Sequence, residues 1–137
     1  MKQTKRDIAA CVALAATLFG FPAPEARADA ILDWNVRSDA LVTESKLGTP
    51  PAIRVMAFVQ TAAYDAVNTV TQRYPAVALE PDAARNASVD AAVAAAHRAA
   101  LAKLIPAQQR SIEAAYQAAM TRIPDGPAKA VGIAAGE

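Results

Sequence analysis

Five polar side chains share one face of an otherwise apolar helical stretch, and they are the first residues in this sequence that could do chemistry. At 100° per residue, a helix that begins near residue 51 places them within about 60° of one another. They are Arg54, Thr61, Asp65, Asn68 and Gln72. Arg54 and Asp65 are separated by 11 positions, about 16 Å at 1.5 Å per residue, so they cannot pair with each other. Each needs a partner from another element, either to tether neighbouring helices or to contribute to a site completed elsewhere.

His97 is the only histidine in the chain, and it projects onto the apolar stripe of a helix expected over residues 89–105. A metal site would need a second histidine or a carboxylate cluster beside it, and the sequence offers neither. A serine nucleophile would need His97 as its base, but no serine lies in a strand-turn-helix elbow. We therefore assign no catalytic, cofactor-binding or metal-binding residue. The prediction is a structural polar network of four residues: Arg54, Asp65, Asn68 and His97.

The first 28 residues have the pattern of a secretory signal peptide. Basic residues at the start precede an apolar run over residues 8–21, and the small-residue triplet Ala26-Arg27-Ala28 follows it. We expect cleavage between Ala28 and Asp29. The apolar run is shorter than the about 20 residues of a membrane-spanning helix. The sequence therefore predicts an exported protein, periplasmic or secreted, with no membrane contact after cleavage.

Charge and cysteine content exclude further classes of function. The predicted signal peptide carries four of the 14 basic and two of the 13 acidic residues, which leaves 10 and 11 in the mature chain. A net charge of about −1 argues against nucleic acid as a partner. Cys11, the only cysteine, leaves with the signal peptide, so disulfides and thiol chemistry are excluded. Neither Gly48 nor Gly126 lies in the context of a phosphate-binding loop.

Hydrophobic periodicity and turn signals predict an all-α fold for residues 29–137, an alanine-rich portion of a helical bundle. The expected elements are four to five helices over 29–47, 51–70, 89–105, 106–123 and 128–137, a loop over 71–87, and Ser88 as an N-cap. The stretch 51–70 is apolar round most of its girth, which predicts a place in the middle of the bundle. Alanine buries little area, and the last helix carries no capping pattern. Both features predict an incomplete domain, completed by the remainder of the same polypeptide.

Four segments of the mature chain carry framework motifs. They are Asp33-Trp34-Asn35, residues 62–68, residues 88–98 ending in Ala96-His97-Arg98, and residues 123–129 leading into Gly132-Ile133-Ala134. Together they resemble the N-terminal region of bacterial vanadium-dependent haloperoxidase-like proteins, which belong to the type 2 phosphatidic acid phosphatase superfamily. The resemblance covers nearly all of residues 29–137.

This resemblance implies an all-helical enzyme in which a lysine, arginines, a serine-glycine pair and two histidines hold vanadate, or phosphate in the phosphatase relatives. The family's Arg-Pro, Pro-Ser-Gly-His and Ser-Arg motifs have no counterpart here and normally lie downstream of such a region. The resemblance therefore implies a non-catalytic N-terminal scaffold portion, inactive by itself and without a cofactor of its own. The alternative is a small periplasmic helical interaction module without enzymatic activity, for example a homo-oligomer that covers its thin core with a second copy.

Overall fold

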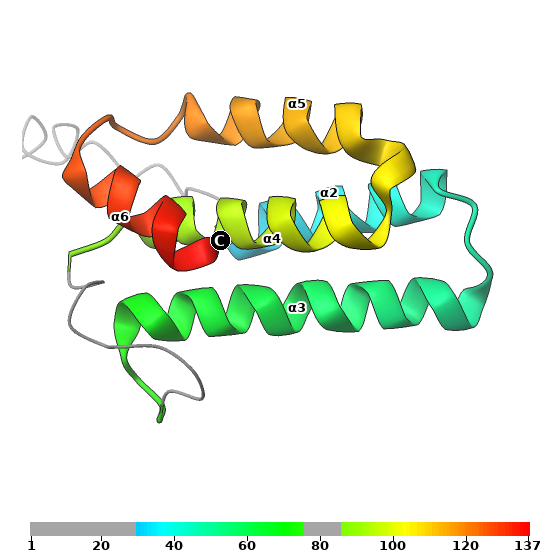
Figure 1. The fold of residues 1–137 in the computed structure, drawn as a ribbon, viewed down its shortest axis with the longest axis horizontal. Coiled ribbons are helices and arrows are strands. Elements are labelled where there is room, and N and C mark those ends of the chain that lie inside the picture. Colours follow the sequence, from blue (N-terminus) through cyan, green and yellow to red (C-terminus); the bar gives the residue numbers. More distant parts are fainter. Residues whose placement is uncertain (1–29, 76–85) are drawn as a thin grey trace, which may run out of the picture.

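The computed structural model describes residues 30–75 and 86–137 (Figure 1). Its elements are α2 Ala30–Glu44, α3 Thr49–Thr71, α4 Val89–Leu104, the 3₁₀ helix η2 Pro106–Gln108, α5 Gln109–Met120 and α6 Pro127–Gly136. The described part has five α-helices and no strand, which confirms the predicted all-α bundle. The predicted signal peptide and most of the predicted 71–87 loop lie outside the described residues. None of the described helices is long and apolar enough to cross a membrane.

Helix α4 is the central element of the bundle. It contacts α2, α3, α5 and α6, which surround it (Figure 1). Residues 91–97 are all buried, so this part of the helix meets protein on every side. Five of these seven residues are alanine. Because the alanine side chain is a single methyl group, it lets the backbones of neighbouring helices come close.

The prediction that the 51–70 helix occupies the middle of the bundle is wrong. Helix α3 lies at its edge (Figure 1), and Ile53, Phe58 and Tyr64 are 65%, 56% and 51% exposed. Only one side of α3 packs inward, through residues such as Val55 and Val59. The physical reason is side-chain size, which an apolar count ignores. Large side chains all round a helix keep its neighbours apart, whereas the alanines of α4 admit a neighbour on every side.

Helix α6 packs against α4 through two glycines four residues apart. A Cβ atom added at Gly132 would run into the backbone oxygen of Ser88, and one added at Gly136 would run into that of Ala92. The Ser88 N–H also donates a hydrogen bond of 2.8 Å to the carbonyl oxygen of Ala128, which joins the starts of the two helices. Small residues on both helices therefore allow backbone to lie directly on backbone.

Side chains close the ends of two helices. Ser88 caps α4 as predicted, because its Oγ accepts a hydrogen bond of 3.2 Å from the N–H of Ala91. Lys129 of α6 donates from Nζ to the carbonyl oxygens of Met120 at 2.8 Å and Ile123 at 3.3 Å. A cation beside the last carbonyls of a helix also complements its dipole. Lys129 thus ties the end of α5 to α6.

Replacement of Gly132 by alanine tests the contact between α4 and α6. Alanine normally favours a helix over glycine by about 1 kcal/mol, but here the new Cβ meets backbone, which cannot turn aside. We expect Gly132→Ala to lower the free energy of unfolding by about 1–3 kcal/mol in urea denaturation. Ala134→Ser, at an exposed position of the same helix, is the control and should change it by less than about 0.5 kcal/mol. Unchanged or higher stability of Gly132→Ala would contradict the close packing.

Candidate functional site

The four residues of the predicted polar network lie in three separate places. Arg54 and Asp65 are exposed on the outer side of α3, whereas Asn68 and His97 are buried. Among the described residues, no hydrogen bond or ion pair joins any two of the four. Exposure of Arg54 and Asp65 is the expected outcome for charges without a partner, because burial of an unpaired charge costs several kcal/mol.

His97 is sealed inside the bundle, with 0% of its surface exposed. Its Nδ1 lies 2.8 Å from the carbonyl oxygen of Val93. Because a carbonyl oxygen only accepts, Nδ1 carries the proton and Nε2 is the free acceptor. The imidazole stacks on Trp34 with ring centroids 5.2 Å apart and planes at 27°. His97 therefore fastens α4 to α2 rather than facing a solvent-filled site.

Burial keeps the imidazole neutral. It holds the pKa of His97 below its ordinary value near 6.5, and the hydrogen bond to Val93 opposes that shift as the smaller effect. Nε2 has no hydrogen-bond partner within the described chain, and neither has the buried Oγ of Ser38, one turn beyond Trp34 on α2. Within the described residues, no three histidine, cysteine, aspartate or glutamate side chains lie together where they could hold a metal ion.

Arg98, directly after His97, joins three helices on the surface of the bundle. Its Nε donates to Glu113 of α5 at 3.0 Å, and its Nη1 donates to Glu137 after α6 at 3.2 Å. The guanidinium carbon lies 4.8 Å from the ring centroid of Tyr116. The hydrogen bond to Glu113 raises the pKa of Arg98, and hydrogen bonds from Gln117 and then Arg98 lower the pKa of Glu113. Because the ion pairs are partly exposed, their contribution to stability is modest.

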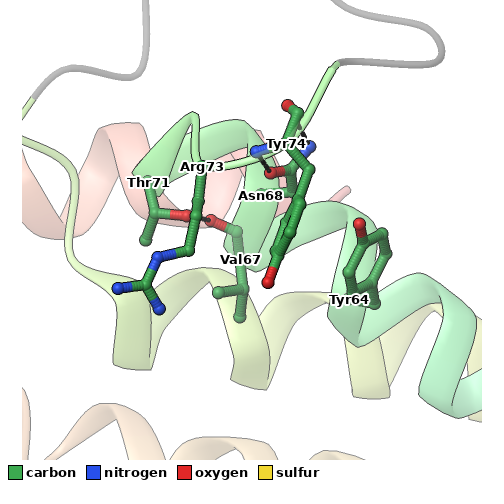
Figure 2. A pocket seen from close by; sticks show the side chains of 6 residues that line it. All are labelled: Tyr64, Val67, Asn68, Thr71, Arg73 and Tyr74. Carbon is green, nitrogen blue, oxygen red and sulfur yellow. Dashed lines mark hydrogen bonds between the residues drawn. The ribbon is translucent and has the colours of Figure 1, made fainter.

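A pocket of about 490 Å³ lies at the C-terminal end of α3 (Figure 2). Its described lining is Tyr64, Val67, Asn68, Thr71, Arg73 and Tyr74. The rings of Tyr64 and Tyr74 have centroids 6.0 Å apart and planes inclined by 32°. Asn68 fixes this wall, since its Oδ1 accepts from the N–H of Tyr74 at 2.9 Å and its Nδ2 donates to the Tyr74 carbonyl at 3.1 Å.

The chemistry that this pocket offers is binding. It presents two phenol rings and the guanidinium of Arg73, while its six described lining residues include no carboxylate, histidine or cysteine. Aromatic rings and a guanidinium favour a planar or anionic group. Sequence reasoning placed Arg73 and Tyr74 in a connecting loop and so missed the pocket. The signal was the asparagine near the helix end, because such a side chain often bonds the backbone beyond the last turn.

Comparison with known proteins gives no match: no family model, no curated protein and no solved structure is similar to this chain. The likeness to haloperoxidase-like proteins therefore stays a hypothesis, and only the four short motifs carry it.

The buried state of His97 predicts a pH-dependent stability. Below about pH 6.5 the unfolded chain binds the imidazole proton more readily than the folded one, so the free energy of unfolding falls as pH decreases, by up to about 1.4 kcal/mol per pH unit. Well above that pH the imidazole is neutral in both states, and the stability is fully present. The pKa values of Glu113 and Asp125 are lowered, so these carboxylates stay ionised in this window. Denaturation at about pH 7 and pH 5, followed by the fluorescence of Trp34, the only tryptophan, measures the difference.

His97→Gln is the control for this prediction, because its amide does not titrate. We expect the variant to lose clearly less stability than the parent protein between the two pH values. Equal losses in both proteins would show that His97 is already charged or accessible in the folded state.

Proposed function

We propose that this chain is a non-catalytic helical scaffold of an exported haloperoxidase-like or acid-phosphatase-like enzyme. One observation supports the proposal most directly: residues from three of the four motifs behind the resemblance join helices of the bundle. Trp34 and His97, from two different motifs, stack on each other in the core. Lys129, from a third motif, donates to the carbonyl oxygens of Met120, the last residue of α5, and of Ile123.

Other motif residues make the same kind of contact. The Oδ1 of Asn35 accepts a hydrogen bond of 2.6 Å from the Nε2 of Gln60, which links α2 to α3. Asp33 lies 3.6 Å from the guanidinium of Arg122 at the end of α5. Both side chains thus make contacts between helices, which is the role expected of framework residues.

The cations that join the helices of the bundle do not form a vanadate site. A multiply charged oxyanion needs several cationic and backbone donors that converge on it. Arg98 and Arg122 are paired with carboxylates, and Lys129 with Asp125 and backbone carbonyls. His97 is neutral and closed to solvent. Vanadate or phosphate chemistry in the proposed enzyme would therefore depend on the remainder of the polypeptide.

A helical interaction module is the second candidate function. Large apolar side chains exposed on α2 and α3 favour it, namely Leu32, Val36, Ile53 and Phe58. Leu32 and Val36 lie one turn apart on α2, and neighbouring exposed apolar side chains mark sites of contact with other protein. In the scaffold proposal, Leu32 and Val36 on α2 are available to the rest of the enzyme.

An activity assay tests the scaffold proposal. We expect the purified chain neither to oxidise bromide with added vanadate and peroxide nor to hydrolyse a phosphate monoester, because the oxyanion-binding motifs are absent from its sequence. A haloperoxidase and an acid phosphatase assayed in parallel serve as positive controls. Turnover of either substrate above the level without protein would contradict the proposal.

Sequencing of the coding DNA beyond codon 137 separates the two candidates. The scaffold proposal expects the reading frame to continue into Arg-Pro, Pro-Ser-Gly-His and Ser-Arg motifs. A reading frame without these motifs would contradict the scaffold proposal and favour the interaction module.

Export and cleavage of the predicted signal peptide are tested separately. When the full chain is produced in a bacterial host, we expect the periplasmic form to begin at Asp29, as measured by intact mass. Ala28→Arg should block processing, because the residue before the cleavage site must be small. Arg27→Lys is the control and should be processed normally. Recovery of the full-length chain in the cytoplasm only would contradict the proposed localisation.

A further inference from the structure

The outward side of α3 is a continuous exposed face with a charge near each end. Its exposed residues recur every three or four positions, so they line one side of the helix. They are Ile53, Arg54, Ala57, Phe58, Thr61, Tyr64 and Asp65. α3 forms the outer edge of the bundle in Figure 1, so this face is turned away from α4. We call it the α3 face.

The two charges of the α3 face have no partner within the described chain. Arg54 and Asp65 are exposed, and neither side chain makes an ion pair or hydrogen bond to another described residue. Their separation is about three helical turns, or about 16 Å, which places them on the same side of the helix but out of each other's reach. Between them lie Phe58 and the small residues Ala57 and Thr61.

We propose that the α3 face binds the same face of a second copy of this chain, with the two α3 helices antiparallel. A two-fold axis between residues 59 and 60 places Arg54 of each copy opposite Asp65 of the partner subunit. The same axis places Phe58 opposite Thr61 of the partner subunit. One pattern of positive, apolar and negative residues is thus complementary to itself, as a two-fold interface requires.

The charges also favour one direction of the two helices. A parallel pair of helices would set Arg54 against Arg54 of the partner subunit and Asp65 against Asp65 of the partner subunit, and like charges in contact oppose association. The antiparallel pair instead forms two ion pairs, one at each end of the apolar middle. For a second copy, the charges therefore favour the antiparallel arrangement.

The middle of the α3 face suits close packing. The Thr61 hydroxyl already donates to the Ala57 carbonyl oxygen at 2.9 Å, so its methyl group can meet the partner without an unpaired polar atom. Ile53 and Ala57 lie one turn apart on the α3 face, and the two-fold axis places Tyr64 of the partner subunit opposite the position between them. A single helix pair buries less than the about 1,200–2,000 Å² of a stable interface. We therefore expect a weak, reversible dimer.

Charge reversal tests the dimer by sedimentation equilibrium of the full chain over a range of concentrations. Arg54→Glu and Asp65→Arg each set like charges against each other at both ends, so each alone should weaken association by about tenfold or more at low salt. The double variant restores opposite charges and should return to within about threefold of the parent protein. Arg110→Glu, an exposed charge on α5, is the matched control and should leave association unchanged.

Three outcomes would overturn the proposal. They are a parent protein that stays monomeric at every concentration, single reversals that leave association unchanged, and a double variant that fails to recover. Because Arg54 and Asp65 are exposed, the variants should unfold at the same temperature as the parent, which separates lost association from lost folding. The measurement involves no oxyanion chemistry, so its failure leaves the proposed scaffold function standing.

Discussion

The close approach of four helices to α4 is the constraint on which the rest of this structure depends. Residues 91–97 carry mostly methyl side chains and are buried on all sides. Methyl groups fill little space, so neighbouring helices must come close to α4 to leave no void. At α6 this requirement is met by Gly132 and Gly136, where any side chain would collide with the backbone of α4.

The small side chains at the centre of the bundle explain where the larger side chains lie. Trp34 and His97 stack at the contact between α2 and α4, and Leu101 of α4 and Ile112 of α5 are fully buried in the same core cluster. Space beside α4 is limited, so the bulky residues of α3 and α2 are divided between the core and the surface. Val59 is fully buried, whereas Ile53, Phe58 and Val36 are exposed. The exposed apolar side chains that favour contacts with other protein follow from this division.

Periodicity and turn residues predicted the class of fold and the approximate position of each helix, although the expected 106–123 helix is η2 Pro106–Gln108 followed by α5 Gln109–Met120. The expected 51–70 helix is Thr49–Thr71, and the expected 89–105 helix is Val89–Leu104 with Ser88 at its N-cap. The central helix was not predictable in the same way, because a helical projection records how many sides are apolar and ignores how large the side chains are. Small residues allow close packing at the centre, but their hydrophobicity is low, so a count of apolar residues gives them little weight.

The sequence predicted the candidate sites only in part, for a similar reason. The apolar stripe of α4 correctly indicated a core position for His97, but its stacking partner lies 63 positions earlier, at Trp34. The polar stripe of α3 was real as a pattern, and the structure turns most of it to solvent. Arg98 gave no periodic signal because its partners, Glu113 and Glu137, come from two other parts of the chain. Contacts between distant segments depend on which helices become neighbours.

Hydrogen exchange of backbone amides tests the central position of α4 most directly. Amides at the centre of a cooperative core exchange only when the whole domain unfolds, while those of peripheral helices exchange through local opening. We predict the slowest exchange in residues 91–101, with rates set by the global free energy of unfolding, and faster exchange along the exposed side of α3. Slowest exchange within residues 51–70, with early exchange of α4, would contradict the central position of α4.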